Sequence, residues 1–235
     1  MKYGIFSIHH FPAAILLSLF VFASVTFAGP PLLCHTFDIG DAKSLPWIGH
    51  NWNLSGNETY EVKNLPADTI ALLNGDSTVL VHMETLRRAA LYGQKDPIAL
   101  KQLLLKLIAR SDASDKNTAS TALAAFDVGY FAETLGQAHW LFKNAVNPAQ
   151  GLDGHALVKK ALQLRGDDPQ MAFAAALITL DGPAADHQDY ARKALAGAKS
   201  DPLLARVLAS HFMSPQSETM AAMISRNSNV KVAQQ

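Results

Sequence analysis

The chain has 235 residues, and its 20 acidic residues balance its 20 basic residues, so no strong field favours nucleic acid or anionic lipid. Hydrophobic residues make up 49% of the chain and aromatic residues only 8%, with Ala and Leu abundant, a composition that favours close-packed helices over a β-sandwich. The single cysteine excludes an intramolecular disulfide framework.

Residues 1–28 have the pattern of a Sec-type signal peptide. Lys2 gives a positive start, residues 13–23 are apolar, and the small residue Ala28 suits cleavage before Gly29. The apolar run is shorter than the roughly 20 residues that a spanning helix needs, and no later segment is long and apolar enough. We therefore expect an exported protein, periplasmic or secreted, with no stable membrane insertion after cleavage.

Residues 29–64 show no sustained hydrophobic period and are expected to form an irregular arm. The apolar side chains of Phe37, Ile39 and Trp47 are too hydrophobic for a solvated tail, so the arm should pack on the rest of the chain. We expect it to cap the first helical hairpin, because a stack of helices needs its end face covered.

Residues 65–226 are predicted to form a helical-repeat domain, followed by a flexible tail at 227–235. Pro and Gly punctuate the helices, since Pro is favoured at a helix start and Gly just past its end. We expect short helices near 66–74 and 79–92 and a third from Pro97. One more should pass through 123–131, with Gly136 marking its end or a kink. Others are expected at 153–165, from Pro169, from Pro202 and at 215–226.

Two segments near the C-terminus repeat each other. VKKALQLRGDDPQMAFAAALI (158–178) aligns without gaps on ARKALAGAKSDPLLARVLASH (191–211), a shift of 33 residues. In both, a helix ends, a short polar loop follows, and Asp-Pro begins the next helix, with Asp as N-cap and Pro at the first helical position. A period of about 33 residues is typical of a helix-turn-helix repeat unit.

The residues Ala161, Leu162 and Leu164, followed by Asp168-Pro169 and Phe173, resemble the junction between two tetratricopeptide repeats (TPRs). The resemblance implies an all-α fold, a stack of antiparallel helical hairpins (a TPR-like α-solenoid) preceded by the irregular arm. In that family the concave face binds peptides or partner proteins, and no catalytic residue carries over.

Cys34 and His35 leave several interpretations open. Lipid attachment requires a small residue directly before the cysteine, and Leu33 occupies that position. Covalent haem attachment requires a second cysteine at the position that Pro31 occupies. Both interpretations are therefore disfavoured. A nucleophile pair is disfavoured because adjacent side chains rarely face each other. A copper or zinc site could use Cys34 with His35 or His50. The remaining interpretations are a buried hydrophobe and an intermolecular disulfide.

Other polar groups have structural alternatives. One segment, 181–189, contains Asp181, Asp186, His187 and Asp189. These residues could form a cation-binding loop or supply helix caps at an inter-repeat turn. The pairs Lys159-Lys160 and Arg192-Lys193 occupy equivalent repeat positions, where they suit the helix dipole or form a basic ridge for an acidic partner. His211 lies in an apolar stripe and is expected to be a core histidine. His139, next to Trp140, either lines a groove or packs, and packing is favoured.

No GxSxG, P-loop, GxGxxG, EF-hand or HExxH pattern occurs in the sequence. We therefore expect a non-enzymatic, exported helical-repeat protein that binds a protein or peptide partner, without nucleic acid and without a cofactor. The alternative is a periplasmic metal-handling protein that uses Cys34, His35 and His50. An enzyme with a cleft between arm and solenoid is a more distant third interpretation, and the sequence selects no reaction for it.

Overall fold

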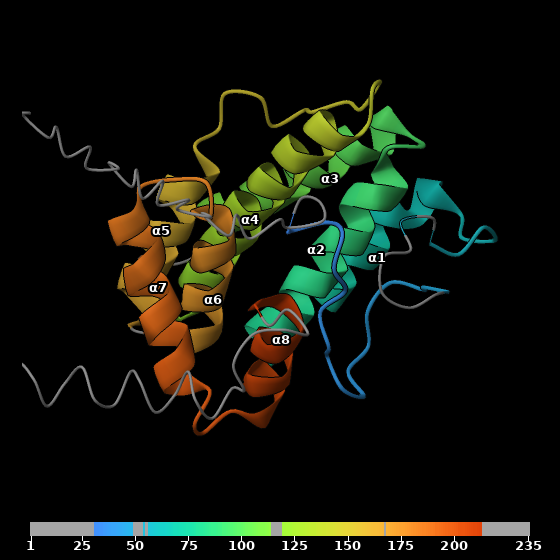
Figure 1. Cartoon of the computed structure of the whole chain (residues 1–235). Helices are drawn as coiled ribbons and strands as arrows, with labels where there is room; N and C mark the ends of the chain where they lie inside the picture. The colour runs from blue at the N-terminus through green and yellow to red at the C-terminus, as the bar shows by residue number, and fades with distance from the viewer. Residues whose placement is uncertain (1–30, 49–53, 55, 114–118, 167, 213–235) are drawn as a thin grey trace, which may run out of the picture.

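The computed structural model describes residues 31–48, 54, 56–113, 119–166 and 168–212, and these residues form helices and irregular segments without a strand (Figure 1). The prediction of an all-α protein is confirmed for this part of the chain. The predicted signal peptide (1–28), His50, the predicted helix at 215–226 and the predicted tail at 227–235 all lie outside the described residues.

The helices follow the Pro and Gly punctuation of the sequence. A short 3-10 helix, η1, comes first, and eight α-helices follow in the described residues. Their bounds are η1 Val62–Asn64, α1 Leu65–Leu72, α2 Val79–Gly93, α3 Pro97–Asp112, α4 Ala119–Leu141, α5 Gly154–Arg165, α6 Pro169–Ile178, α7 Ala184–Gly197 and α8 Pro202–Phe212. None of these helices is long and apolar enough to cross a membrane.

Each Asp-Pro pair begins a helix in the predicted manner. The side chain of Asp96 accepts hydrogen bonds from the N–H groups of Ile98 and Ala99, and Asp168 does the same for the start of α6. Asp201 accepts from the N–H of Leu204 at 2.9 Å. A carboxylate at this position satisfies helix N–H groups that have no partner within the helix and complements the helix dipole.

Two boundaries differ from expectation. The alternative that the helix ends at Gly136 is wrong, because α4 continues to Leu141. Gly136 is exposed, but Leu135 and Ala138 beside it are fully buried, and this packing outweighs the roughly 1 kcal/mol cost of a helical glycine. The segment 181–189, interpreted as a cation-binding loop or as helix caps at a turn, is also helical from Ala184 onward, where α7 begins.

α4 is the central helix of Figure 1, and it packs against α2, α3 and α5. Its contact with α5 is close because Gly129 faces Gly154, and a Cβ on Gly129 would lie 2.6 Å from the Gly154 carbonyl oxygen. α6 and α7 form the other extensively packed pair of neighbours. The sequence repeat aligns α5–α6 with α7–α8, but the most extensively packed pairs of helices are α4–α5 and α6–α7.

The arm, drawn in blue in Figure 1, runs beside α2 and α8. It is held to α2 by a buried polar network, which we call the arm clamp: Glu84, Arg87 and Arg88. Glu84 accepts from Arg87 Nε at 2.8 Å, from Arg88 Nε at 2.7 Å and from the backbone N–H of Phe37 at 3.0 Å. Glu84 and Arg87 are fully buried, because the arm covers the face of α2 that would otherwise meet solvent.

The two arginines of the arm clamp also bind the arm backbone. Arg87 Nη1 donates to the Leu33 carbonyl at 2.9 Å, and Arg88 Nη1 donates to the Leu45 carbonyl. Both guanidinium groups lie over the ring of Trp47, with Arg87 4.8 Å from its centroid. The arm is therefore an ordered part of the fold, fixed along its length by α2.

The same arm reaches α8, at the other end of the described chain. Phe37 stacks on His211 with ring centroids 4.8 Å apart and an interplanar angle of 6°. Asp38 forms an ion pair with Arg206 at 2.8 Å, and its pKa is lowered mainly by that hydrogen bond. Residues from the start and the end of the described chain thus pack together.

Candidate functional site

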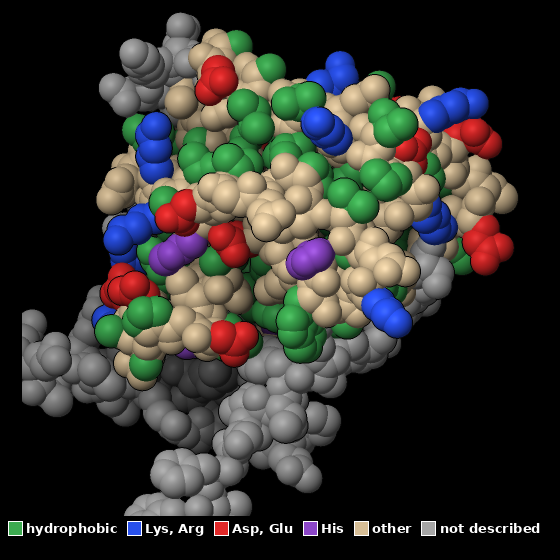
Figure 2. Space-filling view, turned by 90° about the horizontal axis from the view of Figure 1, so that it is seen from above, with side chains coloured by type: hydrophobic (Ala, Val, Ile, Leu, Met, Phe, Trp, Pro, Cys, Tyr) green, Lys and Arg blue, Asp and Glu red, His purple; other side chains and the backbone are tan. Residues whose placement is uncertain are grey.

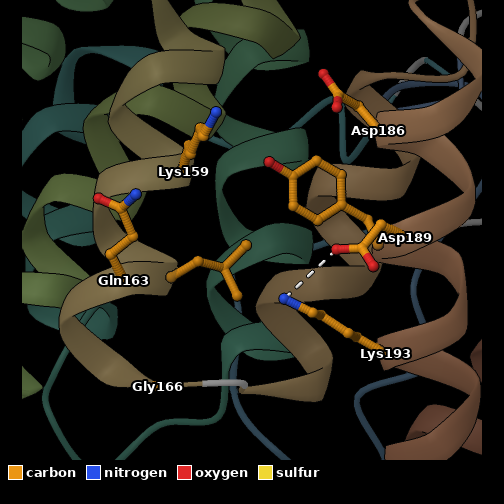
Figure 3. A pocket seen from close by; sticks show the side chains of 8 residues that line it. Lys159, Gln163, Gly166, Asp186, Asp189 and Lys193 are labelled. Atoms are coloured by element: carbon orange, nitrogen blue, oxygen red, sulfur yellow. Dashed lines mark ion pairs between the residues drawn. The ribbon is translucent and has the colours of Figure 1, made fainter.

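A groove between α5 and α7 gathers polar and apolar side chains from the two repeat-equivalent helices (Figure 3). Its volume is about 370 Å³, which lies within the range of small-ligand and peptide side-chain pockets. The lining residues are Lys159, Leu162, Gln163 and Gly166 on the α5 side, and Asp186, Asp189, Tyr190 and Lys193 on α7.

Helical spacing explains why these side chains meet in one groove. On α5, Lys159 and Gln163 are four residues apart, and on α7 the members fall at 186, 189, 190 and 193, so each set lies on one face of its helix. Gly166 ends α5 with φ of 63°, a left-handed backbone conformation that favours glycine. In Figure 3 the α5 and α7 side chains point toward the same space.

The floor of the groove is apolar. Leu162 and Tyr190 are both nearly covered, and the Tyr190 ring packs edge-on to His155 with centroids 6.1 Å apart. Burial raises the pKa of the Tyr190 hydroxyl, and the nearby Asp186 carboxylate adds to the shift. Tyr190 is therefore a neutral hydrogen-bonding group at physiological pH, with an aromatic face beside it.

Charges of both signs stand on the rim. Lys193 Nζ lies 3.5 Å from Asp189 Oδ2, the pair marked in Figure 3, and Arg192 lies 3.7 Å from the same carboxylate. Lys159 and Asp186 form no ion pair with any described residue. The predicted basic ridge is thus only partly basic, since Asp189 offsets the α7 cations and leaves Lys159 and Asp186 as the available charges.

This arrangement can bind but offers no obvious catalytic pair. An apolar floor with separated positive and negative rim groups suits a ligand that has an apolar side chain and polar or charged neighbours, as a peptide segment does. The acidic residues considered for a cation loop are separated in the structure. Asp181 precedes α7, Asp186 lies in the first turn of that helix, and Asp189 is engaged by two cations.

Cys34 and His35 lie in the arm, away from this groove. Cys34 is buried, and burial raises the pKa of its thiol while the charge of Arg87 lowers it. The pKa of His35 is lowered by burial and by Arg87. The structure brings His35 to His211, with ring centroids 5.0 Å apart. His50 is not described, and no group of three or more metal-ligating side chains is found among the described residues.

The remaining histidines that the structure describes have structural contacts. His82 is fully buried, with Nδ1 2.6 Å from Asp127 and Nε2 3.1 Å from the Asn74 carbonyl. His187 Nδ1 lies 2.9 Å from the Ala176 carbonyl. His211 is a core histidine as predicted, whereas the packing role expected for His139 is wrong in that its side chain is exposed.

Sequence reasoning singled out the lysine pairs and the acidic cluster as separate features, but it did not place them in one groove. Tyr190 and Gln163 were not recognised. The available signal was the spacing of Tyr190 four residues after Asp186, which puts both on one helix face. Recognising the groove also required knowing that α5 and α7 lie next to each other, and sequence spacing does not supply that.

The chain matches no known protein-family model, and no curated protein or solved structure is similar enough to it to count as a match.

Proposed function

We propose that this chain is an exported, non-enzymatic helical-repeat protein, TPR-like in its stacking, that binds a segment of a protein or peptide partner in the groove between α5 and α7. The observation that carries the proposal is the combination of an apolar floor, Leu162 and Tyr190, with the available rim charges of Lys159 and Asp186. The predicted signal peptide supports a periplasmic or secreted location.

The apolar floor and the rim charges together indicate which kind of partner segment would fit the groove. An apolar or aromatic side chain of the partner would rest on Leu162 and Tyr190, where burial provides most of the affinity. A carboxylate of the partner would pair with Lys159 and a basic group with Asp186. Rim charges of this kind contribute more to specificity and association rate than to affinity.

Site-specific photo-crosslinking tests the proposal in the native envelope or culture supernatant. A photoreactive amino acid replaces Gln163, an exposed groove residue, and the matched control places it at Gln188, which is exposed on α7 but does not line the groove. We expect one discrete crosslinked product at position 163 and none at 188. Adding Lys159→Glu should reduce that product at least fivefold, in line with the loss of one rim ion pair.

Two results would overturn the proposal. The first is equal crosslinking from positions 163 and 188, which would indicate non-specific proximity. The second is a discrete product at 163 that survives both Lys159→Glu and Asp186→Lys, because the rim charges would then not contribute to recognition. Circular dichroism of each variant confirms that the helices are retained.

The alternative function, metal handling, is favoured by one observation. His35 packs beside His211, and His211 Nε2 is buried with no hydrogen-bond partner among the described residues. An imidazole nitrogen with a free lone pair is a ligand for copper or zinc. Elemental analysis of the purified protein beside Cys34→Ser and His211→Gln tests this. Stoichiometric metal that both variants lose would favour metal handling over partner binding.

A further inference from the structure

The outer face of α3 exposes two large aliphatic side chains. Ile98 is 71% exposed and Leu105 is 55% exposed, and they lie seven residues apart on the same side of the helix. The inner face of α3 is filled by Leu100, Leu103 and Leu107, which are buried. The helix is therefore apolar toward the core and again at two positions toward solvent, a pattern that packing of this chain alone does not explain.

The segment between α4 and α5 extends this apolar surface. Val146 and Pro148 line a hollow of about 480 Å³ together with Ile98, Leu105, Lys101 and Gln102. The segment is fixed, since the Val146 N–H donates to Gln94 Oε1 at 3.1 Å and the Ala145 carbonyl lies 2.9 Å from His139 Nδ1. Next to His139, the indole of Trp140 is 77% exposed.

Lysines flank these apolar side chains. Lys101 and Lys106 on α3 and Lys143 in the segment between α4 and α5 are exposed, and no described residue forms an ion pair with them. The acidic groups at the start of α3 and of α5, Asp96 and Asp153, are engaged as helix caps. The segment between α4 and α5 lies at the top of Figure 1, and Figure 2, seen from above, shows hydrophobic side chains interspersed with Lys and Arg side chains and with some acidic ones.

We propose that this surface, which we call the α3 surface (Ile98, Lys101, Leu105, Lys106, Lys143 and Val146), binds peripherally to an anionic lipid bilayer. The aliphatic side chains would enter the interfacial region, and the lysine side chains would extend to the lipid phosphates. Exposed apolar patches with a basic rim are typical of such sites. Trp140 adds an aromatic side chain of the kind that is enriched at membrane interfaces.

Charge and composition favour an anionic bilayer over a second copy of the chain or another protein as the partner of the α3 surface. A second copy of the chain would bring three lysines against three lysines across a symmetric interface, and like charges in that position cost several kcal/mol. A protein interface is ordinarily rich in aromatic residues and Arg and depleted in Lys, whereas the cations of the α3 surface are all Lys. A bilayer with negatively charged headgroups complements a field of Lys around Ile, Leu and Val.

The balanced charge of the whole chain does not conflict with this surface. The 20 acidic residues that offset the 20 basic ones are distributed over the chain, while the field that a bilayer meets is set by groups within about one Debye length, roughly 8 Å at physiological salt. Peripheral binding also needs no spanning helix, in keeping with the described helices.

Vesicle co-sedimentation tests the proposal. The purified full chain is mixed with phosphatidylcholine vesicles and with vesicles in which about one third of the lipid is phosphatidylglycerol, at low and high salt. We expect binding to the anionic vesicles that falls with salt. The variant Lys101→Glu/Lys106→Glu should lower the partition coefficient more than tenfold, since each lysine near an anionic surface contributes about fivefold. Ile98→Gln/Leu105→Gln should also lower it about tenfold.

The matched control is Lys43→Glu/Lys160→Glu, which makes the same charge change at two exposed lysines outside the α3 surface and should reduce binding less than threefold. Because all variants retain the same N-terminal residues, binding through residues 1–30 would leave them equal to wild type and would overturn the proposal. Absence of binding to anionic vesicles, as expected if the α3 surface binds an acidic protein, would overturn it as well. So would equal binding to both vesicle types at every salt concentration.

Discussion

Neutralising Glu84 should release the arm from α2. Its carboxylate accepts hydrogen bonds from both arginines of the arm clamp and from the N–H of Phe37, and no other carboxylate among the described residues forms an ion pair with Arg87. Glu84→Gln keeps the size of the side chain but leaves the guanidinium of Arg87 buried without a counter-charge. A glutamine amide group also presents N–H donors to neighbours that are themselves donors.

The size of the effect follows from burial. Glu84 and Arg87 are both fully buried, and breaking a buried ion pair by removing one partner costs about 3–5 kcal/mol. In a domain of this size, 1 kcal/mol shifts Tm by about 2–4 °C, so a loss of about 6–20 °C is expected. The lowered stability should appear first in the arm, since the clamp joins the arm to α2 and lies at the edge of the helical core.

Cys34, the only cysteine of the chain, reports directly on the arm. It is buried, and burial raises the pKa of its thiol, so a thiol reagent should react slowly while the arm is docked. If Glu84→Gln lowers the free energy of local opening by about 3 kcal/mol, the modification rate should rise about 100-fold. The measurement is the rate of reaction with a chromogenic disulfide, at a pH where helix content by circular dichroism is unchanged.

Glu61→Gln is the matched control, because the Glu61–Lys63 pair is the same kind of contact at an exposed position, with N···O of 3.2 Å. It should change Tm by less than about 3 °C and leave Cys34 protected, as for other surface ion pairs. Equal Cys34 reactivity in Glu84→Gln and Glu61→Gln would refute the reasoning that the clamp holds the arm.

Three further outcomes are expected. Gly129→Ala should destabilise the protein by at least about 2 kcal/mol in urea unfolding, because the new Cβ would lie 2.6 Å from the Gly154 carbonyl oxygen. Gly136→Ala, whose Cβ would have no atom within 4 Å, should stabilise the protein by about 0.5–1 kcal/mol. Similar effects of the two substitutions would contradict the close contact of α4 and α5. Burial lowers the pKa of His211 from 6.5 to about 4. The unfolded chain therefore binds a proton on this histidine at a higher pH than the folded chain does. The stability due to neutral His211 is complete above pH 6.5 and falls by up to about 3 kcal/mol as the pH approaches 4. His211→Phe should therefore lose less stability than wild type between pH 7.5 and 4.5 in metal-free buffer, and a difference that does not vary with pH would contradict this. Asp168→Ala should cost about 1 kcal/mol in the same unfolding assay through loss of two N-cap hydrogen bonds to α6, and an unchanged midpoint would show that the cap contributes nothing.

The helices of this chain could be predicted from local chemistry, and their packing could not. Asp-Pro at 96–97 and 168–169 fixes a helix start within a few residues, because capping depends on neighbouring atoms only. The contact of α4 with α5 depends instead on Gly129 meeting Gly154. In the sequence each is an isolated glycine, which ordinarily indicates a helix end or a turn.

The arm clamp shows the same limit for polar residues. Within α2, Glu84, Arg87 and Arg88 have the spacing of a solvated, salt-bridged helix face, and the sequence alone gives no reason to bury them. They are buried because the arm, about 40–50 residues earlier, lies across that face. The residues that line the groove between α5 and α7 likewise appear in the sequence as separate lysine and aspartate groups. They lie close together only because of the way α5, α6 and α7 pack.

The contact of the arm with α8 bears on the order in which the chain can fold. Asp38 and Arg206 are separated by 168 residues, and the Leu32 N–H donates to Gln137 in α4, 105 residues away. During synthesis or translocation the arm emerges first, and its last partners emerge when nearly the whole described chain has been made. Contacts between residues so far apart in sequence slow folding, because the loop they close must form first. Until α8 has been made, Phe37 lacks its stacking partner His211 and Asp38 lacks Arg206. The arm therefore completes its contacts only after the C-terminal helices have been made.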